Sequence, residues 1–263
     1  MKHKGLNRFY IGLVLFFLYL PIIILIIYSF NSSKMNIVFE NITFDWYKNL
    51  FSNRELIEAF TNTMIIAVVS TIISTIIGTI SAIGIDKYDF KIKKLVNILI
   101  YIPIVIPEIV LGISLLSMYT LVKLDLGMFT LILSHIAFSI PFVIVSVRSS
   151  LSEVIKTYEE AAYDLGAGKF RTFFKITLPM IMPGVISGAT LAFTLSLDDV
   201  VISYFTAGPG SNTLPLKIYS MIKTGITPDV NALSTLMLLV TIIVLTTSVI
   251  IQSRKLRTKG GAV

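Results

Sequence analysis

Long apolar stretches that are almost free of charge alternate with short charged segments along this chain of 263 residues. A helix needs about 20 mostly apolar residues to cross the hydrocarbon core of a membrane. Six stretches meet this length: Phe9–Phe30, Thr61–Ile85, Val96–Tyr119, Leu126–Val147, Met182–Phe205 and Ala232–Ile251. The pattern therefore predicts an all-α membrane protein with six transmembrane helices.

The composition agrees with this pattern. Hydrophobic residues make up 55% of the chain and charged residues 14%, whereas about a quarter of the residues in a soluble domain are charged. This excludes a soluble enzyme, a secreted toxin and a nucleic-acid-binding protein. The chain has no cysteine, which excludes disulfides, thiolate metal sites and cysteine nucleophiles.

The Lys and Arg residues are distributed unevenly between the two sides of the predicted membrane. With six spans, one side holds 16 of the 22 basic residues, in both termini and in the segments 86–95 and 148–181. The positive-inside rule then predicts that both termini are cytoplasmic. The net charge of +7 is therefore an orientation signal, with some attraction to anionic lipid headgroups.

Small residues recur every fourth position in two of the stretches. The second carries Ser70, Ser74, Gly78 and Ala82, and the fifth carries Gly184, Gly188, Ala192 and Ser196. This spacing allows helix backbones to approach closely, so we expect both helices to pack against protein instead of lipid.

The prolines, the histidine and the tryptophan are less specific indications of structure or function. Pro103 and Pro107 predict kinks in the third stretch. His135 has no second histidine or carboxylate at metal-ligand spacing, which favours a hydrogen-bonded packing residue over a metal ligand. The segment around Trp46 predicts an interfacial helix before the second span.

The segment 148–181 is too long for a simple connection between helices. Ser152 and Glu153 are typical of a helix start, and Gly166 of a helix end. A second, amphipathic stretch follows and ends at Leu178-Pro179. The segment predicts a helical projection that docks into a partner protein, or an interfacial hairpin without a partner.

This segment resembles a known family at every position of its signature. Glu160-Ala161-Ala162, three residues, Gly166, nine residues, Ile176-x-Leu178-Pro179 is similar to the EAA-x3-G-x9-I-x-LP signature of bacterial ABC-importer permeases. The resemblance implies that Glu160 to Gly166 form a coupling helix seated on a cytoplasmic ATPase. It also implies the type I, MetI-like transmembrane domain at 61–251, preceded by a first span and outer loop at 1–60 and followed by a basic tail at 252–263.

A narrower resemblance covers most of the second half of the chain. The blocks that carry it are 134–136, 141–143, 164–167, 193–201, 214–221 and 230–233. They are similar to the C-type permease subunits of spermidine/putrescine importers. The resemblance implies a subunit that forms half of a polyamine path in a bacterial cytoplasmic membrane. Related permeases carry other cationic or polar solutes, and that alternative stays open.

Three carboxylates are the only charges inside the predicted spans: Glu108, Asp198 and Asp199. Intramembrane acids are costly and usually line a path or pair with a base, yet no Lys or Arg lies in any span. On one continuous helix, Asp199 would share the face of the small-residue stripe and Asp198 would lie about 100° away. We expect these acids to line a path for a polycation. A purely structural role is the alternative.

The chain has no G-x-x-x-x-G-K-[ST] sequence, so it carries no ATP-binding loop of that kind. We expect a transport subunit without catalytic residues, bound metal or cofactor, with ATP and Mg²⁺ acting on the partner. The resemblance implies as partners an ABC ATPase dimer, a second permease, an extracytoplasmic polyamine-binding protein and membrane lipid, but no nucleic acid. An autonomous ion-coupled transporter is the weaker alternative, and a membrane-embedded enzyme the weakest.

Overall fold

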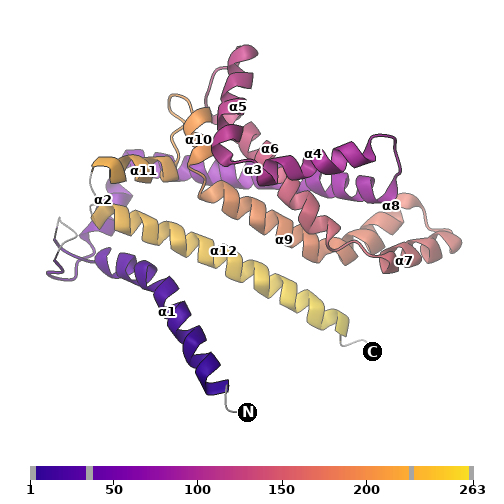
Figure 1. The fold of residues 1–263 in the computed structure, drawn as a ribbon, viewed down its shortest axis with the longest axis horizontal. Coiled ribbons are helices and arrows are strands. Elements are labelled where there is room, and N and C mark those ends of the chain that lie inside the picture. Colours follow the sequence, from indigo (N-terminus) through magenta and orange to yellow (C-terminus); the bar gives the residue numbers. More distant parts are fainter. Residues whose placement is uncertain (1–3, 34–37, 225–227, 261–263) are drawn as a thin grey trace. The chain divides into compact units, whose positions relative to one another are not determined.

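The computed structural model describes residues 4–33, 38–224 and 228–260. Within these ranges every regular element is a helix, and strand pairing is limited to one bridge between Asn31 and Ile42. In chain order the elements are α1 (Lys4–Tyr28), α2 (Asp45–Ser52), α3 (Arg54–Lys87), α4 (Lys93–Val105), α5 (Glu108–Leu121), α6 (Met128–Arg148), α7 (Glu153–Asp164), α8 (Lys169–Thr172), the π-helical turn η1 (Phe173–Thr177), α9 (Leu178–Leu197), α10 (Val201–Thr206), α11 (Leu214–Thr224) and α12 (Pro228–Gly260) (Figure 1). The predicted all-α class is confirmed.

The apolar stretches correspond to helices. Five helical segments in the described part are long and apolar enough to cross a membrane: α1, α3, α6, α12 and the run from α8 through α9. The third stretch forms α4 and α5, which pass the same test together but are bent by 109° at their junction. The described part of the chain therefore has five such spans, or six if the bent pair is one span. The predicted tail at 252–263 continues α12 as far as Gly260, and residues 261–263 lie outside the described part.

The junction of α4 and α5 is sharper than the predicted kinks. Pro103 lies inside α4, which continues to Val105. The break comes at Ile106, whose ψ of 135° is extended, because the residue before a proline is disfavoured in the helical region. Pro107 then lies directly before the first residue of α5. With 14 residues, α5 is about 21 Å long and is too short to cross the hydrocarbon core alone.

The fifth stretch is also interrupted, and the prediction of one continuous helix over Met182–Phe205 is wrong. α9 ends at Leu197 and α10 begins at Val201. The carboxylate of Asp199 accepts backbone hydrogen bonds from the first turn of α10, which lets a new helix begin there. The angular argument that placed Asp199 on the face of the α9 stripe therefore fails.

The chain divides into two compact units, which we describe separately. Unit 1 comprises residues 1–58 and 217–240. The helix predicted around Trp46 is α2, and its indole Nε1 donates a 2.7 Å hydrogen bond to the carbonyl of Asn31. An ion pair of 2.7 Å joins Lys217 to Glu55 in the same unit.

Unit 2 comprises residues 59–216 and 241–263 and is built around α6, eleven of whose 21 residues are buried. Gly78 of α3 and Gly188 of α9 both lie against Val143 of α6. A Cβ atom at Gly78 would lie 2.7 Å from the Val143 Cβ, and one at Gly188 would lie 3.1 Å from the Val143 Cα. All eight residues of the two predicted stripes are buried, so the predicted close packing is confirmed.

We predict that Gly78→Ala lowers the thermal unfolding midpoint of the purified protein. The added Cβ would overlap the rigid Cβ of Val143, and overpacking of this kind costs about 1–3 kcal/mol. Gly84→Ala on the same helix is the matched control, because its Cβ would meet no atom within 4 Å. Equal midpoints for the two variants would contradict the packing at Val143.

Candidate functional site

The predicted projection forms a helix with the expected boundaries. Ser152 lies at the N-cap position of α7, and Glu153 places a negative charge in its first turn, which the helix dipole favours. The Ser152 side chain makes no capping hydrogen bond. The chain leaves the helix through Gly166, whose φ of +81° is in the left-handed region that glycine adopts without strain. The predicted helix and its end at Gly166 are confirmed.

One face of α7 is apolar and exposed. Val154 and Tyr158, four residues apart, are 57% and 56% exposed. Leu165, just beyond the helix, is 88% exposed. The next segment adds Phe170 and Phe174, which are 83% and 60% exposed. We call these five residues the docking face, since exposed apolar side chains on a projecting segment are typical of a contact surface.

The signature residues divide between this surface and the interior. Glu160, Ala161 and Gly166 are exposed, and so is Pro179, the second residue of α9. The partly buried or buried members are Ala162, Ile176 and Leu178. The signature therefore combines residues that a partner can reach with residues that hold the projection against the rest of unit 2.

The charged contact between α7 and the end of α3 was not predicted from the sequence. Glu159 is buried, and its Oε1 lies 2.7 Å from the Nζ of Lys87, the last residue of α3. The hydroxyl of Thr177, the last residue of η1, donates a hydrogen bond to the same oxygen. A sequence signal existed, because Glu159 shares the inward face of α7 with Ile155 and Ala162 at helical spacing. Lys87 is far away in sequence, so the partner itself was not predictable.

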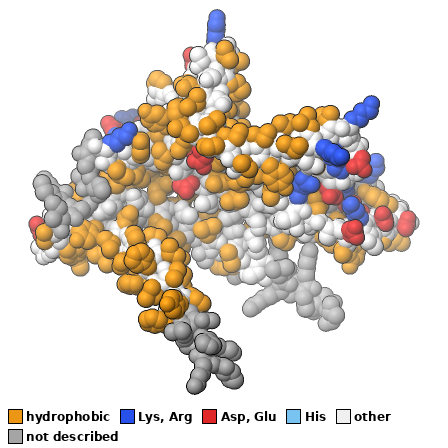
Figure 2. Space-filling model, viewed as in Figure 1, with side chains coloured by type: hydrophobic (Ala, Val, Ile, Leu, Met, Phe, Trp, Pro, Cys, Tyr) orange, Lys and Arg blue, Asp and Glu red, His pale blue; other side chains and the backbone are white. Residues whose placement is uncertain are grey.

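The contact borders an open hollow of about 390 Å³ on unit 2. Its lining residues are Lys87, Tyr88, Lys156, Glu159, Glu160 and Tyr163. On the face drawn in Figure 2, Lys and Arg side chains gather around the end of unit 2 that carries α7. Hydrophobic side chains cover much of the upper part of this unit in the same view (Figure 2).

The structure brings the three intramembrane acids together from three helix ends. Glu108 is the first residue of α5 and is exposed. Asp198 is the C-cap of α9 and is also exposed, whereas Asp199 is only 8% exposed. Glu108 interacts electrostatically with both aspartates. A carboxylate at a helix C-terminus is unfavourable, so Asp198 faces both the dipole of α9 and two like charges.

Asp199 is the acid with hydrogen-bond partners in the protein. Its two oxygens accept bonds from the backbone N–H groups of Ile202 and Ser203, at 3.1 and 2.7 Å. The Ser203 hydroxyl donates a third bond of 2.7 Å. The Nε2 atom of His135 lies 3.0 Å from that hydroxyl and 3.5 Å from the carboxylate. Asp199 therefore holds the start of α10 in place, and Asp198 is the one turned outward.

His135 continues this buried network across the unit. Its Nδ1 lies 2.6 Å from the hydroxyl of Ser196, which lies 3.2 Å from the hydroxyl of Ser70. The chain of contacts thus joins α3, α9, α6 and α10. The prediction that His135 is a hydrogen-bonded packing residue is confirmed. Its approach to Asp199 was missed because the two residues lie far apart in sequence and come from separate helices.

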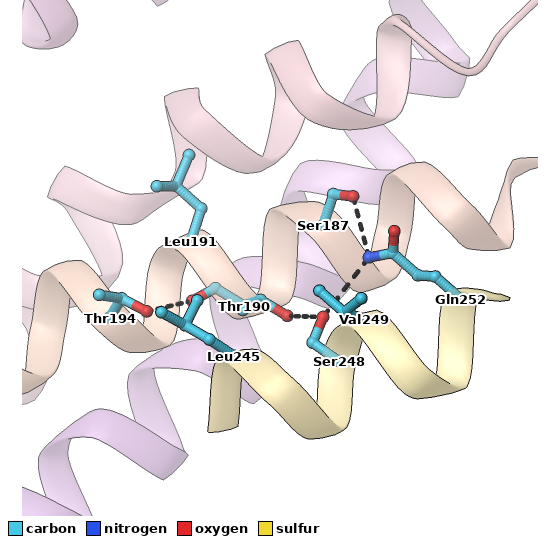
Figure 3. Close-up of a pocket in the computed structure, with 8 residues that line it drawn as sticks. All are labelled: Ser187, Thr190, Leu191, Thr194, Leu245, Ser248, Val249 and Gln252. Atoms are coloured by element: carbon cyan, nitrogen blue, oxygen red, sulfur yellow. Dashed lines mark hydrogen bonds between the residues drawn. The ribbon is translucent and has the colours of Figure 1, made fainter. Parts of the chain in front are cut away.

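A second polar contact joins α9 to the part of α12 that belongs to unit 2. Thr190 donates a 2.7 Å hydrogen bond to Ser248, and Gln252 Nε2 lies 3.2 Å from the hydroxyl of Ser187 (Figure 3). These side chains and their neighbours line a groove of about 310 Å³ (Figure 3). Hydroxyl and amide pairs of this kind hold helices together in lipid.

Apolar helices with carboxylates inside them and a helical projection are typical of membrane transport proteins. The family model for the binding-protein-dependent transport system inner membrane component matches residues 74–258. The chain therefore belongs to this family of ABC-importer permeases, as its signature predicted. Members of the family are membrane transport components and not enzymes.

The curated relatives cover nearly the whole chain. The spermidine/putrescine transport system permease protein PotC of Shigella flexneri is 42% identical over 247 residues, which are 94% of this chain and 94% of that protein. PotC of Escherichia coli K12 is 42% identical over 93% of this chain and 92% of its own. The putrescine transport system permease protein PotI of E. coli K12 is 41% identical over 84% and 82%. The predicted resemblance to C-type polyamine permeases is confirmed.

Solved structures show the same fold. A chain of a bacterial ABC transporter that imports the acidic polysaccharide alginate matches with a TM-score of 0.73, at 18% identity over 96% of both chains. A chain of the inward-facing MetNI methionine ABC transporter matches with a TM-score of 0.64, at 19% identity over 76% of this chain and 95% of its own. At this identity the likeness establishes the ABC-importer permease fold and nothing about cargo.

We predict that His135→Leu destabilises the protein more than Ser70→Ala. The leucine leaves Ser196, Ser203 and Asp199 without a shared partner, and one buried polar group left unsatisfied costs about 1–3 kcal/mol. Ser70→Ala removes only the 3.2 Å contact at the end of the network. Thermal unfolding of the purified variants measures the difference. A His135→Leu midpoint equal to that of the wild type would show that the network does not stabilise the fold.

Proposed function

We propose that this chain forms half of the translocation path of an ATP-driven polyamine importer. The observation that carries this proposal is the identity of about two residues in five, over almost the full length, to permeases named for spermidine and putrescine. In this proposal α4 and α5 count as one bent crossing, so the chain has six spans with both termini in the cytoplasm. The excess of basic residues on the side of α7 supports that orientation.

The domain division follows from the same proposal. Residues 61–251 form the type I permease domain, 1–60 supply the added first span and outer loop, and 252–263 supply a basic cytoplasmic tail. The segment 148–181 is the coupling loop within the permease domain. Support comes from the family match over 74–258, which includes this loop.

The docking face supplies the contact with the ATPase. In this proposal Glu160, Ala161 and Gly166 lie at the ATPase surface, while Ala162, Ile176 and Leu178 fix the projection to the membrane helices. Pro179, exposed at the start of α9, completes the coupling segment. ATP and Mg²⁺ act on the ATPase dimer, and this chain binds neither. A second related permease completes the path, and an extracytoplasmic binding protein delivers the polyamine. Delivery by a binding protein is supported by one structural neighbour, an alginate ABC transporter in complex with an alginate pentasaccharide-bound periplasmic protein.

The acids supply the charge of the path. Glu108 and Asp198 are exposed and have no basic partner in any apolar stretch, so an ammonium group in transit replaces the missing counter-ion. Asp199 is buried and adds its negative charge to theirs while it holds the start of α10. An acidic path of this kind favours cations over anions, and several carboxylates suit a cargo with several amino groups.

We predict that Glu108→Gln and Asp198→Asn each lower uptake of labelled spermidine and putrescine by about tenfold or more, which corresponds to about 1.4 kcal/mol of lost interaction. Both side chains are exposed, so the variants should keep the wild-type unfolding midpoint. Asp125→Asn, in the exposed connection between α5 and α6, is the matched control and should transport normally. Wild-type uptake by both test variants would exclude a path lined by these acids.

Asp199→Asn should behave differently from the other two. The amide cannot accept all three hydrogen bonds, so we predict a lower unfolding midpoint together with lower uptake. An Asp199→Asn protein with the wild-type midpoint and lower uptake would show that this acid acts on the cargo directly.

We predict that Leu165→Asp abolishes co-purification of the ATPase without changing the stability of the permease. Leu165 is 88% exposed, so a charge there leaves the fold intact but disrupts an apolar contact. Thr157→Ala, an exposed substitution on α7 outside the docking face, is the control. Recovery of the ATPase in gentle detergent is the measurement. Wild-type recovery with Leu165→Asp would rule out the docking face as the ATPase contact.

A further inference from the structure

We propose that the buried contact of Glu159 with Lys87 and Thr177 is the joint that carries movement of α7 into the membrane helices. Glu159 and Lys87 are thereby positioning residues that couple ATP hydrolysis to transport. This proposal rests on the proposed docking of α7 on an ATPase. It adds the route by which a movement of the docked helix is transmitted to the translocation path.

The geometry of the joint is specific. One carboxylate oxygen of Glu159 receives both the Lys87 ammonium, at 2.7 Å, and the Thr177 hydroxyl. The side chain of Glu159 is 8% exposed and that of Lys87 is 29% exposed. Lys87 ends α3, and Thr177 directly precedes α9. This one oxygen atom of α7 thus contacts the last residue of α3 and the residue directly before α9.

The energetics of such a pair favour a mechanical role over a stabilising one. A buried ion pair is often no more stabilising than an apolar pair of the same size, but separating its partners leaves a buried charge and is costly. The helices therefore resist moving apart, and a displacement of α7 displaces the ends of α3 and α9 with it.

A neighbouring pair shows the contrast. Lys156 of α7 and Asp86 of α3 lie 3.9 Å apart, and their side chains are 54% and 32% exposed. A long, exposed pair contributes little, because water and ions screen it. The same two helices are therefore joined once by a buried contact and once by a weak one, which provides a matched control.

Both α3 and α9 run from the joint toward the hydrogen-bond network of His135 and Asp199. α3 runs without a break from Lys87 to Ser70, where the hydroxyl meets Ser196 of α9. Farther along, Thr63 accepts a hydrogen bond from the backbone N–H of Leu214, about 36 Å from Lys87 along the helix axis. α9 itself ends at the acids.

The segment that carries Thr177 is not a regular α-helix. Residues Phe173–Thr177 form a π-helical turn, and such turns are rare and recur at functional sites. This turn lies between α8, which carries part of the docking face, and α9, which leads to the acids. A shift of the docked surface therefore reaches α9 at a segment whose hydrogen bonding already departs from the α-helical pattern.

The test uses the complete importer in proteoliposomes, with the ATPase, the second permease and the spermidine-loaded binding protein. ATP hydrolysis and labelled spermidine uptake are measured in the same preparation. We expect Glu159→Gln and Lys87→Met to assemble and hydrolyse ATP, with spermidine imported per ATP reduced by about tenfold. The exchanged pair Lys87→Glu with Glu159→Lys should restore part of the ratio, since the Thr177 hydroxyl can accept as well as donate. Asp86→Asn with Lys156→Met, the matched control, should keep the wild-type ratio.

Thr177→Val is the second variant, and it keeps the test decisive if Glu159→Gln does not fold. It preserves the ion pair, removes the contact toward α9 and should lower the ratio in the same direction by less. An unchanged ratio in Glu159→Gln, or in Thr177→Val where Glu159→Gln does not fold, would overturn the joint. An equal fall in the Asp86/Lys156 control would also overturn it. Failure of the wild-type chain to assemble with any ATPase would instead refute the proposed function, so the two failures are distinguishable.

Discussion

The constraint on which this structure depends is that every polar backbone group within lipid needs a partner inside the protein. Regular helices satisfy that constraint, and the two interruptions within apolar stretches show how it is met elsewhere. At the first, Pro107 has no N–H to satisfy. At the second, the Asp199 carboxylate takes up the N–H groups that begin α10. The hydroxyl of Ser203, which contacts His135, donates a further hydrogen bond to that carboxylate.

The sequence predicted well whatever depends on local pattern. Apolar length located the spans, four-residue spacing of small residues located the close packing around Val143, and the EAA signature located α7 and its end at Gly166. Each of these features lies within one continuous segment, so it can be recognised from a single sequence.

The sequence predicted poorly whatever depends on two distant segments. The contacts of Glu159 with Lys87 and of His135 with Asp199 each join residues from different helices, and no periodicity within either helix indicates its partner. The break at Asp199 was missed for a related reason. An apolar run with two acids near its end is compatible with a continuous helix, and only the geometry of the cap shows that the helix restarts.

Along the chain, α9 separates the docking face from Asp198 and Asp199, and the two ends of α9 carry two kinds of contact. At the projection, apolar side chains provide area without strong direction, which suits a surface that must bind and release. At Glu108 and Asp198, exposed carboxylates provide charge without a basic partner, which under the proposed function suits a cargo that must not stay. The directional hydrogen bonds lie between the two, where rigidity is useful.

The close approach at Gly112 has a consequence for how the path changes shape. A Cβ there would lie 2.7 Å from the ring of Phe205, so α5 and α10 pack as one block. Both helices begin at a break, one after Pro107 and one after Asp199. Glu108 is the first residue of α5, so this block carries one of the two exposed acids, whereas Asp198 belongs to the end of α9. Under the proposed function, the spacing between these two charges therefore depends on how α5 and α10 lie against α9.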